Sequence, residues 1–92
     1  MSLILNEYRS KLITHILQAK SQHEVSSLVD AAIKSLEQNR VHGYIIGRFI
    51  DKILFELSEF SPMNNHAQHW SNIKIALILF TRIKKNLNAS VN

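Results

Sequence analysis

The side chains of this chain that could do chemistry gather in one short stretch, SPMNNHAQHWSN, at positions 61–72. If a helix runs through His66 and His69, the two imidazoles lie one turn apart and project to the same side. That spacing can supply two ligands to a metal ion. A metal needs more ligands, however, and no acidic residue follows Glu59. A third ligand would have to come from a histidine or a carboxylate on another part of the chain.

The same stretch has a structural interpretation. His69 falls on the apolar line that continues through Ile73 and Phe80. His69 and Trp70 would then cover the end of the core, while His66 and the neighbouring asparagines cap or solvate the start of a helix. We favour this interpretation, so we predict no cofactor and no metal site, with His66 and His69 as weak metal candidates.

No other catalytic arrangement is recognisable. The chain has no G-x-G-x-x-G, no P-loop, no H-E-x-x-H and no G-x-S-x-G motif. It has no cysteine, which excludes disulfides, thiolate zinc sites and cysteine nucleophiles. General acid–base catalysis requires convergent titratable groups, and the sequence indicates no such pair. We therefore expect a protein that is not an enzyme.

The composition is that of an ordinary globular protein. Of the 92 residues, 46% are hydrophobic and 20% are charged, so the chain should fold rather than stay disordered. This length predicts a single domain over residues 1–92 with one modest core. The apolar runs are too short for a signal peptide or a membrane span. We expect a soluble, cytoplasmic protein that makes no membrane contact.

Helices are the expected secondary structure because glycine and proline together number only three. Apolar residues recur with the helical period in four segments, at about 3–20, 22–38, 43–60 and 64–87. No segment shows the alternation of a strand. Because the links are short, the simplest packing is an all-α, compact antiparallel four-helix bundle with up-down-up-down topology.

Several residues mark the expected helix ends. Ser21 and Glu24 have the spacing of a capping box, which predicts that the second helix starts there. Asn39 tolerates the left-handed conformation that ends a helix. The fourth helix has two possible starts, with Ser61 as cap before Pro62, or a turn later with Asn64 or Asn65 as cap.

Two glycines lie four residues apart at the edge of the third helix's apolar face. Glycine inside a helix costs about 1 kcal/mol relative to alanine, so such a pair needs a reason. We interpret Gly43 and Gly47 as a sign that a neighbouring helix crosses very close by.

The feature that points most directly to function is an excess of apolar surface on the last two helices. Tyr44 and Phe55 fall on the polar side of the third helix, and Ile75 and Leu79 face away from the main stripe of the fourth. Grouped apolar residues rimmed by cations resemble a protein interface. The alternative is that the bundle buries these residues itself. The predicted interface comprises Tyr44, Arg48, Phe55, Ile75, Leu79 and Arg82.

The predicted function is that of a non-enzymatic helical interaction module that binds a protein partner, a second copy of itself, or both. An alternative is suggested by the charge distribution, because the net charge of +4 comes entirely from residues after position 60. These cations are Lys74, Arg82, Lys84 and Lys85. They predict binding of nucleic acid or another anionic ligand, although cations also suit a helix C-terminus and the helix centre lacks base-reading side chains. A histidine-based metal site is the third alternative.

Overall fold

The computed structural model describes residues 4–60 and 67–91, apart from the side chains of residues 88–91. These residues form four helices and no strand, which confirms the all-α four-helix prediction. The helices are α1 (Leu5–Gln18), α2 (Gln22–Gln38), α3 (Gly43–Ser58) and α4 (Ala67–Val91). α1 and α3 each end two residues before the predicted ends at 20 and 60, whereas α4 continues beyond the predicted end at residue 87.

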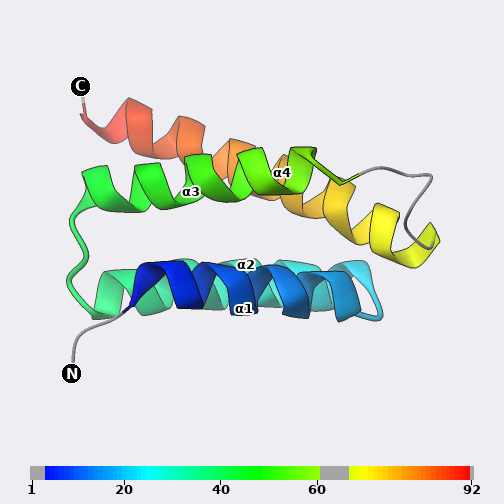
Figure 1. The fold of residues 1–92 in the computed structure, drawn as a ribbon. Coiled ribbons are helices and arrows are strands. Elements are labelled where there is room, and N and C mark those ends of the chain that lie inside the picture. The colour runs from blue at the N-terminus through cyan, green and yellow to red at the C-terminus, as the bar shows by residue number, and fades with distance from the viewer. Residues whose placement is uncertain (1–3, 61–66, 92) are drawn as a thin grey trace.

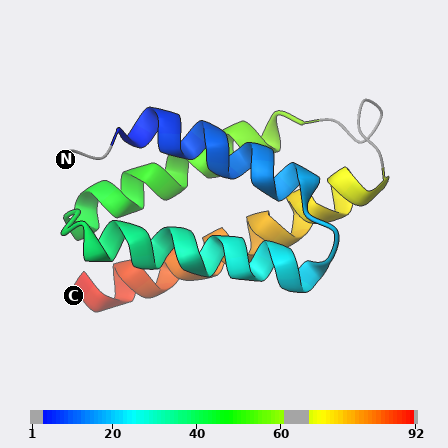
Figure 2. The same ribbon diagram turned by 90° about the horizontal axis from the view of Figure 1, so that it is seen from below.

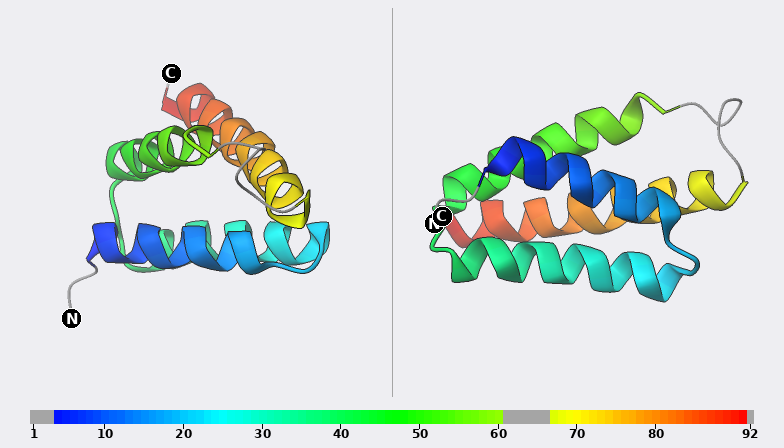
Figure 3. Two further views of the ribbon diagram at one scale, coloured as in Figure 1. Left: turned by 45° about the vertical axis from the view of Figure 1, so that its right-hand side comes forward. Right: turned by 60° about the horizontal axis from the view of Figure 1, so that its bottom comes forward.

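The helices form two layers, with α1 and α2 side by side in one and α3 and α4 in the other (Figure 1). Successive helices reverse direction along the view in Figure 1, but α4 crosses the others obliquely (Figures 2 and 3). Because of this course, α4 contacts each of the other three helices. This central position explains why the middle of α4 is apolar nearly all round.

The core lies between the two layers and receives side chains from every helix. Tyr8 of α1 stacks on Phe49 of α3, with ring centroids 6.0 Å apart. Burial of such aliphatic and aromatic groups supplies most of the favourable free energy of folding. The largest fully buried apolar side chains are Phe80, Ile16, Leu36, Ile50, Ile53, Leu57, Ile73, Val25 and Val29.

The predicted cap at the start of α2 is present. The Ser21 hydroxyl oxygen accepts a hydrogen bond from the Glu24 backbone N–H at 3.1 Å. The Glu24 carboxylate reaches back one residue further than in the usual motif and accepts from the Lys20 backbone N–H at 2.7 Å. The Glu24 amide is one that the helix itself leaves without a partner, and the Lys20 amide belongs to the link before the helix.

The structure confirms the predicted end of α2 at residue 38, with Asn39 as its C-cap, but the left-handed residue is one position later than expected. The left-handed residue is Arg40, with φ of 59°, and not Asn39, whose φ is −84°. The Val41 N–H donates to the Leu36 carbonyl and the Arg40 N–H donates to the Glu37 carbonyl, both at 3.0 Å. These two bonds form a Schellman motif, in which an arginine occupies the position that glycine usually takes.

A buried amide joins α4 to the end of α1. Asn72 is fully buried, and its Nδ2 donates to the carbonyls of Ile16 at 2.9 Å, Leu17 at 3.3 Å and Ala19 at 2.8 Å. Its Oδ1 accepts from Gln68 at 2.9 Å. Carbonyls at a helix C-terminus have no intrahelical partner, so Asn72 caps α1 from a different helix. This link fixes the first turns of α4 against α1.

The predicted caps of α4 at Ser61, Asn64 and Asn65 lie outside the described residues. Over residues 4–60 and 67–91, no helix is long and apolar enough to span a bilayer.

Candidate protein interface

The outer face of α3 carries two exposed aromatic rings among charged side chains. Tyr44, Arg48, Asp51 and Phe55 are spaced by four, three and four residues, so they share one side of the helix, opposite the core. We call these four residues the α3 stripe. Tyr44 is 65% exposed and Phe55 is 67% exposed, as their position on the polar side of the helix predicts.

Two ion pairs hold α3 from both sides. The Arg9 guanidinium of α1 donates to the Glu56 carboxylate at 2.7 Å, and Lys84 of α4 pairs with Asp51. Partly exposed pairs of this kind contribute little free energy, about 0–1 kcal/mol each. Their effect is on orientation, because together with the buried side of α3 they resist rotation of the helix and keep the α3 stripe facing outward.

The start of the α3 stripe is also fixed locally. The His42 side chain caps α3, since its Nδ1 accepts from the Tyr44 N–H at 3.1 Å. The Arg48 guanidinium carbon lies 6.0 Å from the centre of the Tyr44 ring, within the range of a cation–π contact. The histidine cap was not predicted, because the sequence pattern alone does not distinguish it from a loop residue.

The glycine pair does not mark a close helix crossing within the chain, so that interpretation was wrong. A Cβ added at Gly43 or Gly47 would meet no atom within 4 Å. Gly43 is the first residue of α3, whereas Gly47 lies within the helix, beside Tyr44 and Asp51 on the helical projection. The surface next to the α3 stripe is therefore open at Gly47.

The outer face of α4 is basic with one apolar side chain in its middle. Lys74, Arg82 and Lys85 are exposed on this face, and Ile78 among them is 57% exposed. A shallow groove of about 390 Å³ runs along it, lined by Leu77, Ile78, Thr81, Arg82 and Lys85. Ile78 was not among the predicted interface residues, although its helical spacing from the cations places it on the same face.

The remaining predicted interface residues are less available. Ile75 and Leu79 are half-buried and pack against the core, whereas Arg82 is exposed. The other helices of the bundle thus cover part of the apolar surface of α4, because α4 has neighbours on more than one side. The exposed apolar surface of the predicted set is concentrated at Tyr44 and Phe55 on α3.

A groove between α1 and α3 extends the exposed surface toward the N-terminal helix. It has a volume of about 240 Å³ and is lined by Leu5, Asn6, Arg9, Ile45, Arg48, Phe49 and Lys52. Ile45 is 38% exposed, while Arg9 is held by Glu56 and by the Asn6 side chain. Arg48 belongs to the α3 stripe and also lines this groove, so the two features are continuous.

The four predicted anion-binding cations do not form one free set. Lys84 pairs with Asp51 and its side chain is 28% exposed. Lys74, Arg82 and Lys85 remain on the outer face of α4. An anion would therefore meet three cations around Ile78 rather than the predicted four.

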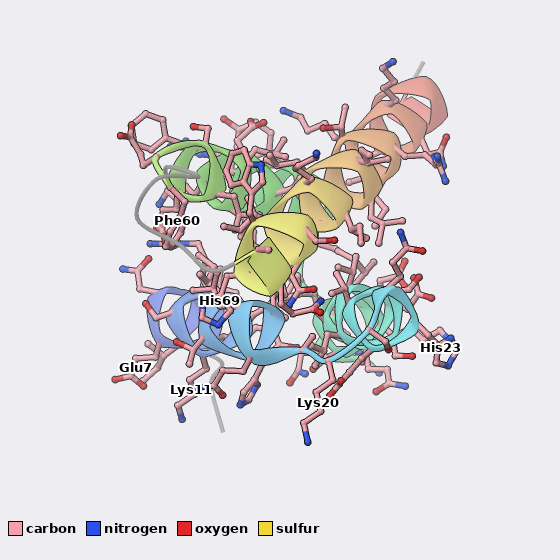
Figure 4. The ribbon with its side chains drawn as sticks, turned by 90° about the vertical axis from the view of Figure 1, so that its right-hand side faces the viewer. Glu7, Lys11, Lys20, His23, Phe60 and His69 are labelled. Carbon is pink, nitrogen blue, oxygen red and sulfur yellow. The ribbon has the colours of Figure 1, made fainter. Side chains whose placement is uncertain are left out.

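The two histidines of the metal hypothesis cannot be brought together, because His66 lies outside the described residues. His69 lies between the first turn of α4 and the C-terminal end of α1, whereas the side chains of Glu7, Lys11, Lys20 and His23 point outward (Figure 4). It borders a hollow of about 330 Å³ together with Leu17, Gln18, Ala19, Lys20 and Gln68. Among the described residues, no three His, Cys, Asp or Glu side chains gather to hold a metal ion.

The chain was compared with protein-family models, with curated proteins and with solved structures, and none of them matches. Function must therefore be inferred from the geometry alone.

Proposed function

We propose that this protein is a non-enzymatic interaction module that binds another protein chain through the outer face of α3. The main observation behind the proposal is the pair of aromatic side chains on that face, Tyr44 and Phe55, each about two-thirds exposed. Tyrosine and phenylalanine dominate the energetics of protein interfaces because they bury large apolar areas with few rotatable bonds.

The surroundings of the two rings support this proposal. Buried aromatic anchors at interfaces are surrounded by polar residues that fix orientation, and Arg48 and Asp51 separate the rings here. The ion pairs and the His42 cap hold the face in place before a partner arrives. A preorganised surface loses less conformational entropy on binding.

The test compares two double variants of the tagged chain. Tyr44→Ser with Phe55→Ser removes both rings from the α3 stripe. Glu7→Ser with Lys11→Ser is the matched control, because these exposed residues point away on the far side of α1 (Figure 4). Light scattering reports self-association, and co-purification from the source cells reports a different partner.

The proposal predicts a stoichiometric complex, with itself or with another protein, that the aromatic double variant loses and the control keeps. Far-ultraviolet circular dichroism must show that both variants are helical. A chain that stays single and recovers no stoichiometric partner contradicts the proposal, and so does a complex that survives loss of both rings.

A second candidate function is binding of an anionic ligand on the outer face of α4. It is favoured by one observation, namely that Lys74, Arg82 and Lys85 are exposed on one face and no acidic residue occurs after Glu59. Fluorescence anisotropy with a labelled oligonucleotide tests it. Affinity should fall steeply as salt rises, since phosphate neutralisation releases counterions. Binding that is unchanged in an Arg82→Glu, Lys85→Glu variant contradicts it.

A further inference from the structure

We infer that the partner of the α3 stripe is a second copy of this chain, paired with it through antiparallel α3 helices about a two-fold axis. The inference rests on the proposed function and names the partner and the register. In a two-fold interface, the same surface patch contacts itself, so every residue must be compatible with its symmetry mate. The α3 stripe meets that requirement at each of its four positions.

The register follows from the sequence positions of the stripe. The midpoint between Tyr44 and Phe55 lies between Phe49 and Ile50, and the midpoint between Arg48 and Asp51 falls at the same place. A two-fold axis through this midpoint sets Tyr44 of one copy against Phe55 of the other at both ends of the contact. In the centre it sets Arg48 of each copy against Asp51 of the other.

The pairing is complementary in chemistry. The ends of the contact bring together aromatic rings, which attract beyond the area they bury. The centre contains two contacts between Arg48 of one copy and Asp51 of the other, so opposite charges meet. A parallel arrangement would instead set Arg48 against Arg48. The four-three-four spacing is also that of a coiled-coil seam, in which side chains of two helices interdigitate at a shallow crossing angle.

The open backbone at Gly47 has a place in this arrangement. Gly47 lies on the Asp51 side of the stripe, and the two-fold axis sets the Gly47 residues of the two copies on the same flank, near the centre of the contact. A Cβ at Gly47 would contact nothing within the chain, so folding of one copy does not require glycine there. Close approach of a second helix, in contrast, does require glycine at this position. Asp51 can keep its own Lys84, because a carboxylate has acceptor sites for more than one donor.

The outer face of α4 is a poorer candidate for self-pairing. Its exposed charges, on Lys74, Arg82 and Lys85, are all positive. Two copies paired through this face would set like charges against each other, which disfavours association. The mixed charges of the α3 stripe avoid this repulsion.

Reversal of the two central charges tests the register by light scattering over a concentration series. Arg48→Asp sets aspartate against Asp51 of the second copy, and Asp51→Arg sets arginine against Arg48 of the second copy. Each variant alone should dimerise about a hundredfold more weakly or worse, because like charges meet at two symmetric positions. A mixture of the two variants should form a heterodimer, since every central pair is then opposite in charge.

Two controls keep this experiment decisive. Lys11→Asp makes the same change of net charge as Arg48→Asp on the outer face of α1, and it should leave dimerisation unchanged. If Asp51→Arg unfolds because the introduced guanidinium would lie beside Lys84, adding Lys84→Glu restores an opposite-charge pair within the chain.

The outcomes separate this inference from the proposed function. A wild-type dimer that both single variants retain, or a mixture that does not recover association, overturns the register while self-association still supports an interaction module. A wild-type chain that stays single at every concentration also overturns the inference. In that case, a different protein partner that is lost with Tyr44 and Phe55 would still support the proposed function, and lack of any partner would contradict both.

Discussion

Replacement of Asn72 should show how strongly one buried amide holds the bundle together. Asn72→Ala removes both N–H donors that serve the carbonyls of Ile16, Leu17 and Ala19. The Ile16 carbonyl keeps a bond from the Ala19 N–H at 3.2 Å, so two carbonyls lose a partner without an evident replacement. No buried side-chain nitrogen or oxygen in the described part of the chain lacks a partner, so the native network is complete.

The expected magnitude follows from those two carbonyls. A buried polar group left without a hydrogen bond costs about 1–3 kcal/mol, so loss of two should lower the free energy of unfolding of Asn72→Ala by about 2–6 kcal/mol. Asn72→Asp should be worse, because a carboxylate of nearly the same shape has no donor and places a negative charge against carbonyl oxygens. A domain of this size is typically stable by about 5–15 kcal/mol, so the aspartate variant approaches unfolding.

Urea denaturation followed by circular dichroism measures these differences. Gln18→Ala is the control, because it shortens an exposed amide side chain at the end of α1 and should change stability by no more than about 0.5 kcal/mol. Acidification should restore part of the stability of Asn72→Asp, since a protonated carboxyl carries one O–H donor. An alanine variant as stable as wild type, or an aspartate variant no less stable than the alanine variant, would contradict this account of Asn72.

Three further perturbations have expected outcomes. Arg40→Gly should raise the free energy of unfolding by about 0.5–1 kcal/mol in urea denaturation, because glycine adopts the left-handed conformation without the Cβ penalty; a destabilised variant would show that the arginine side chain makes a compensating contact. Phe55→Ser should leave thermal stability nearly unchanged but lose self-association in light scattering, and a large fall in melting temperature would show that the ring belongs to the core. Arg82→Glu should flatten the salt dependence of any oligonucleotide binding by about one phosphate contact, and an unchanged slope would place the anion elsewhere.

Helix positions could be predicted from the sequence because they depend on local signals. The period of apolar residues determined which face of α3 is buried, and the Ser21–Glu24 spacing marked the start of α2. The end of α2 at residue 38 was predicted correctly, but the left-handed residue was not, since Asn39 is the more favourable residue type for that conformation and Arg40 adopts it. The register of the Schellman bonds, and not intrinsic preference, decides which residue takes the strained position.

The role of Asn72 could not be predicted, because its three acceptors are 53 to 56 residues away in the chain. Its own position, beside an apolar stripe, is equally compatible with a solvated residue at the edge of a helix. For a related reason, the sequence left open whether the bundle covers Ile75 and Leu79, which are half-buried in the structure. How much of α4 is covered depends on the oblique course of that helix across its neighbours, which periodicity does not report.

The exposed aromatic area on α3 limits how tightly two copies can associate. A phenylalanine or tyrosine side chain buries about 200 Å², so two rings per copy, each about two-thirds exposed, offer about 500 Å² in a dimer. At about 25 cal/mol per Å², their burial contributes at most about 13 kcal/mol, against an association cost of at least about 4 kcal/mol. The difference of about 9 kcal/mol corresponds to a dissociation constant of about 0.3 μM as the tight limit from the rings. Self-association would therefore depend on protein concentration, and a measurement confined to nanomolar protein would find single chains even if the α3 stripe is the interface.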